Sequence, residues 1–343
     1  MKSSIVIAIL AVASLVVLFA QTPTTPPTPL TSTTLPTNQL LSEPGPTFRI
    51  ADAELPAPLT FIAYGDQRFT DPANTTATNP RIRQWLVTQI AAEHPGAVIM
   101  NGDVPLAGSV ANDYTVFQSE TKIWRDQKLQ VFPTLGNHEF AGTDPQQDLE
   151  HWWAAFPDLK NRRWYATQLG LRVYLLALDS DTSLLPGSDQ ARWIEKQIAG
   201  LPPSVDFVII SLHHPPVADV QTHIEVDHNP RPNEIALRDY LSQTAKTSHA
   251  TFLISAGHIH NYERAVVDGV TYLVSGGGGA PPYFVERTAQ DLYRSIVFPN
   301  YHYVKFTLEK DRLHADMYRV LDPEAEKLTV GIKDSFDLMA KPR

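Results

Sequence analysis

Residues 255–264 read "SAGHIHNYER" and place two histidines, His258 and His260, one residue apart. The run "ATFLI" (residues 250–254) has strand character and leads directly into them. Two imidazoles at the end of one strand indicate a functional edge rather than an ordinary turn. If the carboxyl end of this strand lies at a binding site, other strand ends should supply the rest of that site.

Four other apolar runs with strand character end in polar residues of the same kinds. They read "LTFIAYGD" (59–66), "GAVIMNGD" (96–103), "VFPTLGNHE" (131–139) and "DFVIISLHHPP" (206–216). Their ends carry Asp66, Asp103, Asn137 with His138, and His213 with His214. Ligands of α/β sheets bind at the carboxyl ends of the strands, and carboxylate, amide and imidazole groups bind divalent cations. One such residue after a strand is usually a turn former, but five such ends favour a metal site.

Helical patterns lie between several of these strands. Residues 79–94 and 231–244 have apolar residues at helical spacing, and Asn79 with Pro80 is the start signal of the first. Residues 187–201 add Ser188 as an N-cap and Gly200 as a stop. Strands that alternate with helices predict a layered α/β domain. Towards the C-terminus, residues 269–279 and 301–320 alternate apolar and polar positions, which predicts antiparallel strands that close a second sheet.

Composition excludes several kinds of chemistry. The chain has 343 residues and no cysteine, so disulfides, thiolate metal sites and cysteine nucleophiles are all excluded. Its formal net charge of −9 argues against a protein that coats nucleic acid, because such binding needs clustered lysine and arginine. Any metal must be held by nitrogen and oxygen ligands.

The N-terminal region predicts export. Residues 1–20 have a lysine followed by a short apolar stretch, which is the layout of a secretory signal peptide, with a retained membrane anchor as the alternative. Residues 21–47 are rich in proline and threonine and predict a disordered linker. The folded domain is expected over residues 48–343. We therefore expect a secreted, periplasmic or cell-surface protein, with the N-terminus as a possible tether to a membrane or cell wall.

The order of the strand-end motifs resembles that of a known family. The series "GDQR", "NGDV", "GNHE", "LHHPP" and "GHIH" is similar to the calcineurin-like metallophosphoesterases, and "GHIHNYER" resembles their purple acid phosphatase branch. The resemblance runs from about Phe61 to Arg264. It implies an α/β fold with four layers, in which two mixed β-sheets are flanked by helices and a two-metal site lies at one edge.

The resemblance also implies a ligand for each metal position. Asp66, Asp103 and His260 would hold the first ion, and Asp103 would bridge to a second ion held by Asn137, His213 and His258. In "LHHPP" the ligand is assigned to His213, because the family pattern leaves one residue between ligand and proline. His214 would then line the substrate pocket, and the exchanged assignment stays open. Two divalent ions, or iron, are expected, with Fe, Mn, Zn and Mg as candidates.

The activity that the resemblance implies is hydrolysis of small phosphate monoesters by attack of a metal-bound hydroxide. His138 would contact phosphate and protonate the leaving oxygen as general acid; alternatively it only orients Asn137 or a carboxylate. Two other functions stay open. One is a phosphodiesterase or nucleotidase on the same fold, and the other is a non-catalytic surface binding module with a degraded metal site.

Two positions depart from the family pattern. Arg68 stands where many members have a histidine ligand, and Leu106 stands where purple acid phosphatases have a tyrosine ligand. A guanidinium group cannot bind a metal. Water therefore completes the ligand set of the first ion, or that ion is weakly bound. Arg68 would face the metal site and bind substrate phosphate. The plainer alternative for Arg68 is a surface ion pair with Asp71. His223 and His228 lie in the loop after the fourth motif, where they could overhang the metal site and select substrate; the favoured interpretation is that they are solvated loop residues without a role.

Overall fold

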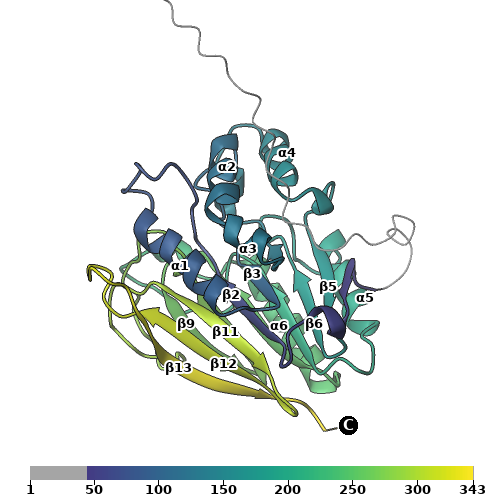
Figure 1. The fold of residues 1–343 in the computed structure, drawn as a ribbon. Helices are drawn as coiled ribbons and strands as arrows, with labels where there is room; N and C mark the ends of the chain where they lie inside the picture. Colours follow the sequence, from purple (N-terminus) through teal and green to yellow (C-terminus); the bar gives the residue numbers. More distant parts are fainter. Residues whose placement is uncertain (1–44, 343) are drawn as a thin grey trace, which may run out of the picture.

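The protein is described by a computed structural model that covers residues 45–342. The predicted signal or anchor (residues 1–20) and nearly all of the predicted linker (21–47) lie outside the described residues. The predicted fold class is confirmed: two mixed β-sheets are packed together and flanked by helices (Figure 1). Among residues 45–342, no helix combines the length and the apolar character needed to cross a bilayer.

The first sheet has seven strands. In spatial order they are β1 (Phe48–Ile50), β5 (Tyr165–Leu169), β6 (Val173–Ala177), β7 (Phe207–Ser211), β8 (Thr251–Ala256), β10 (Val270–Ser275) and β9 (Tyr262–Val267). The strands β6, β7, β8 and β10 run parallel, and β5 and β9 are antiparallel to their neighbours β6 and β10. Every residue of β7 is buried, as expected for a central strand covered on both faces.

The second sheet has six strands. In spatial order they are β13 (Val330–Met339), β12 (Arg312–Val320), β11 (His302–Leu308), β2 (Thr60–Tyr64), β3 (Ala97–Met100) and β4 (Gln130–Pro133). The strands β2, β3 and β4 are parallel, whereas β11, β12 and β13 form an antiparallel meander. The sheet therefore joins an early parallel part to a late antiparallel part of the chain.

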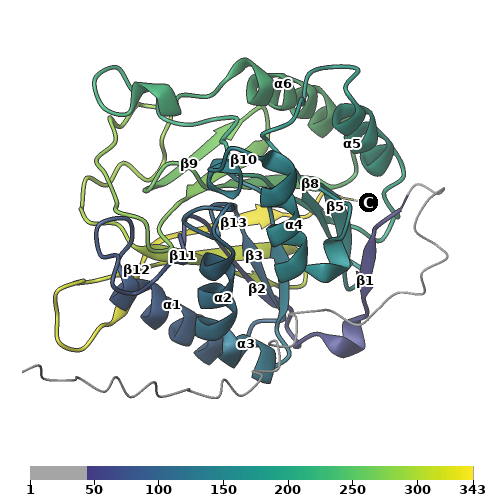
Figure 2. The same ribbon diagram turned by 90° about the horizontal axis from the view of Figure 1, so that it is seen from above.

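Helices cover the outer face of each sheet. The α-helices are α1 (Pro80–Ala92), α2 (Ala111–Glu120), α3 (Lys122–Asp126), α4 (Pro145–Ala155), α5 (Asp189–Ala199) and α6 (Pro232–Thr247). Short 3-10 helices are η2 (Asp52–Glu54), η3 (Asn137–Phe140), η4 (Pro157–Leu159) and η5 (Val226–His228). Figure 2 shows α5 and α6 on one side of the paired sheets and α1, α2 and α3 on the other.

Alternate residues of the central strands supply two apolar clusters. Along β7, Phe207 and Ile209 belong to the cluster between the two sheets, whereas Val208 and Ile210 belong to the cluster under α5 and α6. Successive side chains of a strand point to opposite faces. A single buried strand of this kind therefore stabilises both interfaces of the sheet.

The three predicted helices form as α1, α5 and α6, and two of them begin at their predicted caps. The Asn79 side chain accepts the main-chain N–H of Ile82 at 3.1 Å, and the Ser188 hydroxyl accepts that of Ala191 at 3.2 Å. Each cap satisfies a donor that the first helical turn leaves free. These local signals are confirmed because they depend only on neighbouring residues.

The prediction for the C-terminal strands was partly wrong. The strands β11, β12 and β13 complete the second sheet as expected, but β10 enters the first sheet between β8 and β9. The reason is the tight turn at Asp268 and Gly269, whose φ angles of 50° and 78° suit a two-residue hairpin. This hairpin pairs β10 with β9, and β10 also pairs in parallel with β8, so both strands belong to the first sheet.

A buried carboxyl group connects two segments that flank the strand ends. Glu263, in β9, accepts the main-chain N–H of Asp219 at 2.6 Å through Oε2, and its Oε1 atom is buried without a hydrogen-bond partner. Burial, and then the nearby Asp219 carboxylate, raises the pKa of Glu263 to about 8. Glu263 is therefore protonated in the folded protein at neutral pH.

This pKa predicts how stability depends on pH. Unfolded glutamate ionises near pH 4.3, so the contribution of Glu263 is complete below that pH and is lost as the pH rises through about 8. Glu263→Gln cannot ionise and should be more stable than the unmodified protein at pH 8 by about 2–4 kcal/mol. At pH 4 the difference should vanish. Thermal unfolding followed by circular dichroism at both pH values measures this, and an equal shift at both would contradict it.

Candidate metal centre

The predicted site residues follow five strand ends at one edge of the paired sheets. The strands β2, β3 and β4 are parallel neighbours, and so are β7 and β8, so each group brings its carboxyl ends together. The two groups adjoin: Nδ1 of His213, after β7, lies 2.9 Å from the carbonyl oxygen of Asn101, after β3. All nine predicted residues lie in this region: Asp66, Arg68, Asp103, Asn137, His138, His213, His214, His258 and His260.

Four of these residues bring their ligand atoms together. Oδ1 of Asn137 lies 3.0 Å from Nε2 of His213 and 3.1 Å from Nδ1 of His258. These two nitrogens are 3.3 Å apart, and Nε2 of His213 is 3.2 Å from Oδ1 of Asp103. Ligands about 2.0–2.1 Å from a tetrahedral zinc ion lie about 3.3 Å from one another. We call these four atoms the four-donor site, and their spacing fits one divalent cation.

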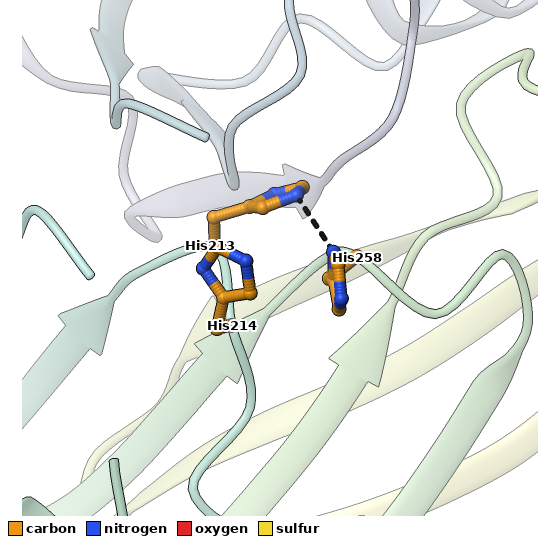
Figure 3. Close-up of side chains that lie close together, drawn as sticks. All are labelled: His213, His214 and His258. Carbon is orange, nitrogen blue, oxygen red and sulfur yellow. Dashed lines mark hydrogen bonds between the residues drawn. The ribbon is translucent and has the colours of Figure 1, made fainter. Parts of the chain in front are cut away.

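The orientation of His213 favours it as the ligand of the "LHHPP" motif. Its Nδ1 donates to the carbonyl of Asn101, which leaves the lone pair of Nε2 for the four-donor site. Figure 3 shows its ring directed at His258, with the contact between them dashed. His214 also lies close enough to form a group with His213 and His258, but its Nδ1 is 2.8 Å from the Ser180 hydroxyl. His214 is therefore held by Ser180, whereas His213 is directed at the other donors.

A second pair of donors lies beside the first group. Oδ1 of Asp66 and Nε2 of His260 are 3.5 Å apart, and both atoms are buried without a hydrogen-bond partner. Nδ1 of His260 is 2.8 Å from the carbonyl oxygen of Pro281, so it carries the proton and Nε2 offers a lone pair. We call Asp66 Oδ1 and His260 Nε2 the two-donor site. Buried polar atoms without partners are costly unless something binds them.

Arg68 lies next to the carboxylate that the two sites share. Its Nη2 is 3.4 Å from Oδ2 of Asp103, and its side chain is 18 % exposed. The guanidinium thus faces the groove, as expected from the favoured interpretation, and its ion pair is with Asp103 rather than Asp71. The charge of Arg68 lies where many family members place a neutral ligand.

His138 is held at the groove by two contacts. Its main-chain N–H donates to Oδ1 of Asp103 at 3.0 Å, and its Nδ1 bonds to the carbonyl oxygen of Leu106. The remaining nitrogen, Nε2, lies 3.8 Å from Oδ2 of Asp103. Leu106 stands where purple acid phosphatases have a tyrosine ligand, and its main-chain carbonyl orients His138.

The charge states of these groups suit cation binding. Burial, and then the neighbouring His213 and His228, lowers the pKa of His258 well below its ordinary value. Burial likewise lowers the pKa of His138, although Asp103 opposes this. Burial disfavours ionisation of Asp103, but His213, His138 and Arg68 together hold its pKa below the ordinary value. At neutral pH His258 therefore presents a neutral imidazole and Asp103 an ionised carboxylate, the forms that bind metals.

Four of the site residues have an unusual backbone conformation. Asp66, Arg68, Asp103 and His258 have φ angles of 62°, 48°, 54° and 70°, in the left-handed region that side chains seldom adopt. Such conformations cost about 1–3 kcal/mol each and persist where surrounding contacts impose them. Their presence in four site residues indicates that the strand ends are shaped for function rather than for stability.

Glu139 was missed by the sequence analysis. Its side chain is buried and accepts three main-chain N–H groups, from Asp103 at 3.0 Å, Val104 at 2.9 Å and Gly136 at 2.7 Å. The residue therefore joins the loop after β3 to the loop after β4 and fixes Asp103 relative to Asn137. Its position directly after "GNH" was visible, but nothing local indicated its partners.

The interpretation of His228 as a solvated residue was wrong. Its ring centre is 4.4 Å from that of His258, and its Nδ1 is 3.0 Å from the hydroxyl of Tyr283. Tyr283 also donates to the carbonyl of His258 at 3.0 Å. His223, by contrast, has a side chain that is 83 % exposed and is paired with Glu286. No sequence pattern separates these two loop histidines.

A small cavity adjoins the four-donor site. Its volume is about 230 Å³, and Asn137, His214, His228 and His258 contribute to its lining. A substrate group that enters this cavity would lie against the outer side of the four-donor site. The cavity therefore marks the direction from which a ligand approaches.

The residues present fit a bound divalent cation. Two observations support this: the spacing of the four donors, and the two buried unpartnered atoms of Asp66 and His260. The donor set is nitrogen and oxygen only, which suits Zn, Mn, Fe and Mg and offers nothing to metals that need thiolates. The fit is better at the four-donor site than at the two-donor site.

Solved structures of low sequence identity share this fold. A purple acid phosphatase, PPD1 from yellow lupin (Lupinus luteus), is 16% identical with a TM-score of 0.63 over 82% of this chain and 54% of its own. PhoD is 14% identical with a TM-score of 0.59 over 84% and 72%. A dimetal phosphatase from Danio rerio is 14% identical with a TM-score of 0.56 over 83% and 99%. This chain spans about half the length of the lupin enzyme.

The comparisons with sequences give one match. No curated protein matches the chain significantly. The family model of the calcineurin-like phosphoesterases matches residues 77–262, which include Asp103, Asn137, His213, His258 and His260. Because this match covers more than half of the chain and the fold agrees with it, the chain belongs to the calcineurin-like phosphoesterase family.

Proposed function

We propose that this protein is a metal-dependent phosphoesterase that hydrolyses phosphate monoesters. The proposal depends on one observation: ligand atoms from five strand ends meet in one groove. Neighbouring atoms of the four-donor site lie 3.0–3.3 Å apart, and Asp66 and His260 add two unpartnered atoms beside them. Family membership supports the general activity, a metal-dependent hydrolase.

The groove suits a substrate that carries concentrated negative charge. A divalent cation bound here would supply positive charge to phosphate oxygens and make a water molecule more acidic. Arg68 adds a fixed charge whose planar N–H groups match phosphate oxygens. A phosphate monoester is a dianion, and the adjoining cavity of about 230 Å³ leaves room for a compact ester group. These features favour a small phosphorylated substrate.

His138 is the group that would deliver a proton to the leaving oxygen. Its Nδ1 is committed to the carbonyl of Leu106, so Nε2 is the nitrogen that exchanges a proton in the groove. An alkoxide is a poor leaving group unless it is protonated as the ester bond breaks. Because Nδ1 keeps its proton for the Leu106 carbonyl, His138 would act as the imidazolium, a form that the negative charge of a bound phosphate would favour, and would release the Nε2 proton to the departing oxygen. His214 and His228 line the cavity beside it and would orient the ester group.

We also propose that the protein is exported and acts outside the cytoplasm. Residues 1–20 have the layout of a signal peptide or anchor, and residues 21–47 have the composition of a flexible spacer. A spacer of this kind would hold the phosphoesterase domain away from a membrane or cell wall. Comparison of the N-terminus of the mature protein with the gene-encoded sequence tests whether residues 1–20 are removed.

The function is tested with two chromogenic substrates. Metal-free protein reloaded with Mn²⁺ or Zn²⁺ should release p-nitrophenol from p-nitrophenyl phosphate with a higher kcat/KM than from bis(p-nitrophenyl) phosphate. Metal-free protein should be inactive. Preference for the diester would assign the phosphodiesterase alternative. No hydrolysis of either ester by metal-loaded protein would contradict a catalytic role and favour a binding module.

Removal of the shared carboxylate charge should abolish activity. Asp103→Asn keeps the size of the side chain but loses the charge that borders the four-donor site and Arg68. We expect kcat/KM to fall by more than about 100-fold, with less metal retained after dialysis. Asp126→Asn, at an exposed position of helix α3, is the matched control and should keep both properties.

Replacement of His138 should separate proton transfer from metal binding. His138→Ala should lower kcat by about 10²–10⁴ for an alkyl phosphate, whose leaving group needs protonation. The loss should be smaller for p-nitrophenyl phosphate, whose leaving group is already a weak base. Metal content, measured by elemental analysis, should stay unchanged. Equal losses for both substrates would assign His138 to positioning instead.

A further inference from the structure

The two halves of the metal centre are unequal. The four-donor site gathers one amide oxygen, one carboxylate oxygen and two imidazole nitrogens with neighbouring atoms 3.0–3.3 Å apart. The two-donor site has only Asp66 Oδ1 and His260 Nε2, at 3.5 Å. The Asp103 carboxylate is its third potential donor, because one of its oxygens lies within 4.8 Å of an Asp66 carboxylate oxygen, and Oδ2 is the oxygen that the four-donor site does not use. The occupancy of the two-donor site therefore depends on what Oδ2 contacts.

That oxygen already has a cationic partner. Nη2 of Arg68 lies 3.4 Å from Asp103 Oδ2, and the guanidinium is protonated at every accessible pH. A divalent cation that used Oδ2 would meet this like charge in a poorly solvated groove, where repulsion is weakly screened. Arg68 supplies positive charge at the shared carboxylate but no lone pair to a metal.

The backbone fixes Arg68 in this position. The main-chain N–H groups of Asp66, Arg68 and Phe69 donate to the carbonyls of Gly102, Asp103 and Val104 at 3.1, 3.0 and 2.7 Å. The Arg68 carbonyl in turn accepts a hydrogen bond from the buried Arg83 side chain at 3.1 Å. The loops after β2 and β3 are thus joined residue by residue. These hydrogen bonds between the two loops keep the Arg68 guanidinium next to Asp103.

Asp66 also has a structural role that does not require a cation at the two-donor site. Its Oδ2 accepts the main-chain N–H of His258 at 2.9 Å, and His258 supplies one nitrogen of the four-donor site. Asp66 therefore positions a ligand of the neighbouring site. Its presence does not require that a second cation bind at the two-donor site.

We propose that the four-donor site binds one divalent cation tightly and that the Arg68 guanidinium takes the place of the second cation. This inference rests on the metal centre of the proposed function and changes the number of tightly bound metal ions per chain from two to one. In such a centre one phosphate oxygen meets the metal ion, and another meets the N–H groups of Arg68. The positive charge at the phosphate then comes from one bound metal ion, which can exchange, and from the Arg68 guanidinium, which is part of the chain.

Metal stoichiometry tests this without reference to activity. Metal-free protein is titrated with Mn²⁺, bound metal is measured after equilibrium dialysis, and the electron paramagnetic resonance spectrum is recorded. We expect one tightly bound ion per chain with a single-ion spectrum. A second ion should bind at least about 100-fold more weakly. Arg68→His adds an imidazole and removes the charge, so it should bind two ions with dissociation constants within about tenfold and give an exchange-coupled spectrum.

A matched control separates the position from the substitution. Arg192→His makes the same change on the exposed surface of α5 and should still bind one ion tightly. Two equally tight ions in the unmodified protein would overturn the inference but leave the proposed function intact. A single ion in folded Arg68→His would also overturn it, because Arg68 would not be what excludes the second. No tight ion in the unmodified protein would overturn the metal centre itself.

Discussion

The buried carboxylate of Asp103 is the group on which the arrangement of the site depends. Its Oδ1 lies 3.2 Å from His213 and accepts the main-chain N–H of His138, while its Oδ2 lies 3.4 Å from Arg68. The side chain is almost completely buried, so its charge is costly unless cations or N–H donors surround it. The surrounding loops supply those donors from three different strand ends.

Rigid contacts hold these loops at the required distances. Glu139 accepts main-chain N–H groups from both Asp103 and Gly136, and so connects the ends of β3 and β4. Gly136 is needed where it stands, because a Cβ atom there would lie 2.5 Å from Oδ1 of Asp103. Ligands held in this way need little rearrangement to receive a cation, which is the condition for precise binding. The strain at four site residues is the cost of that geometry.

The segment after β10 supports the histidines of the groove. Residues 276–300 follow β10 and place the carbonyl of Pro281 on His260 and the hydroxyl of Tyr283 on His228 and His258. Arg287 anchors the segment, since it donates to Asn261 at 2.8 Å and to the carbonyl of Tyr262 at 2.7 Å. The candidate metal ligands His258 and His260 are therefore coupled to the segment after β10 through "NYER", the second half of the motif that contains the histidines.

The sequence by itself determined the elements and motifs that local patterns encode. The N-caps at Asn79 and Ser188 and the polar residues at strand ends could be read directly, because each depends on neighbours along the chain. The layered α/β class followed from the alternation of strands and helices, and its four-layer form followed from the family resemblance. The gathering of Asp66, Asp103, Asn137, His213, His258 and His260 was predictable because strands of an α/β sheet deliver their carboxyl ends to one edge.

Only the tertiary structure decided which of these residues meet which partners. Arg68 pairs with Asp103, 35 residues away, rather than with nearby Asp71, and His228 meets Tyr283, 55 residues away. Glu139 and the position of β10 were likewise invisible in the sequence. Such contacts depend on how the two sheets and their loops pack together. A short sequence pattern contains no information about which distant residues this packing brings into contact. The unequal donor sets of the centre are a property of this packing.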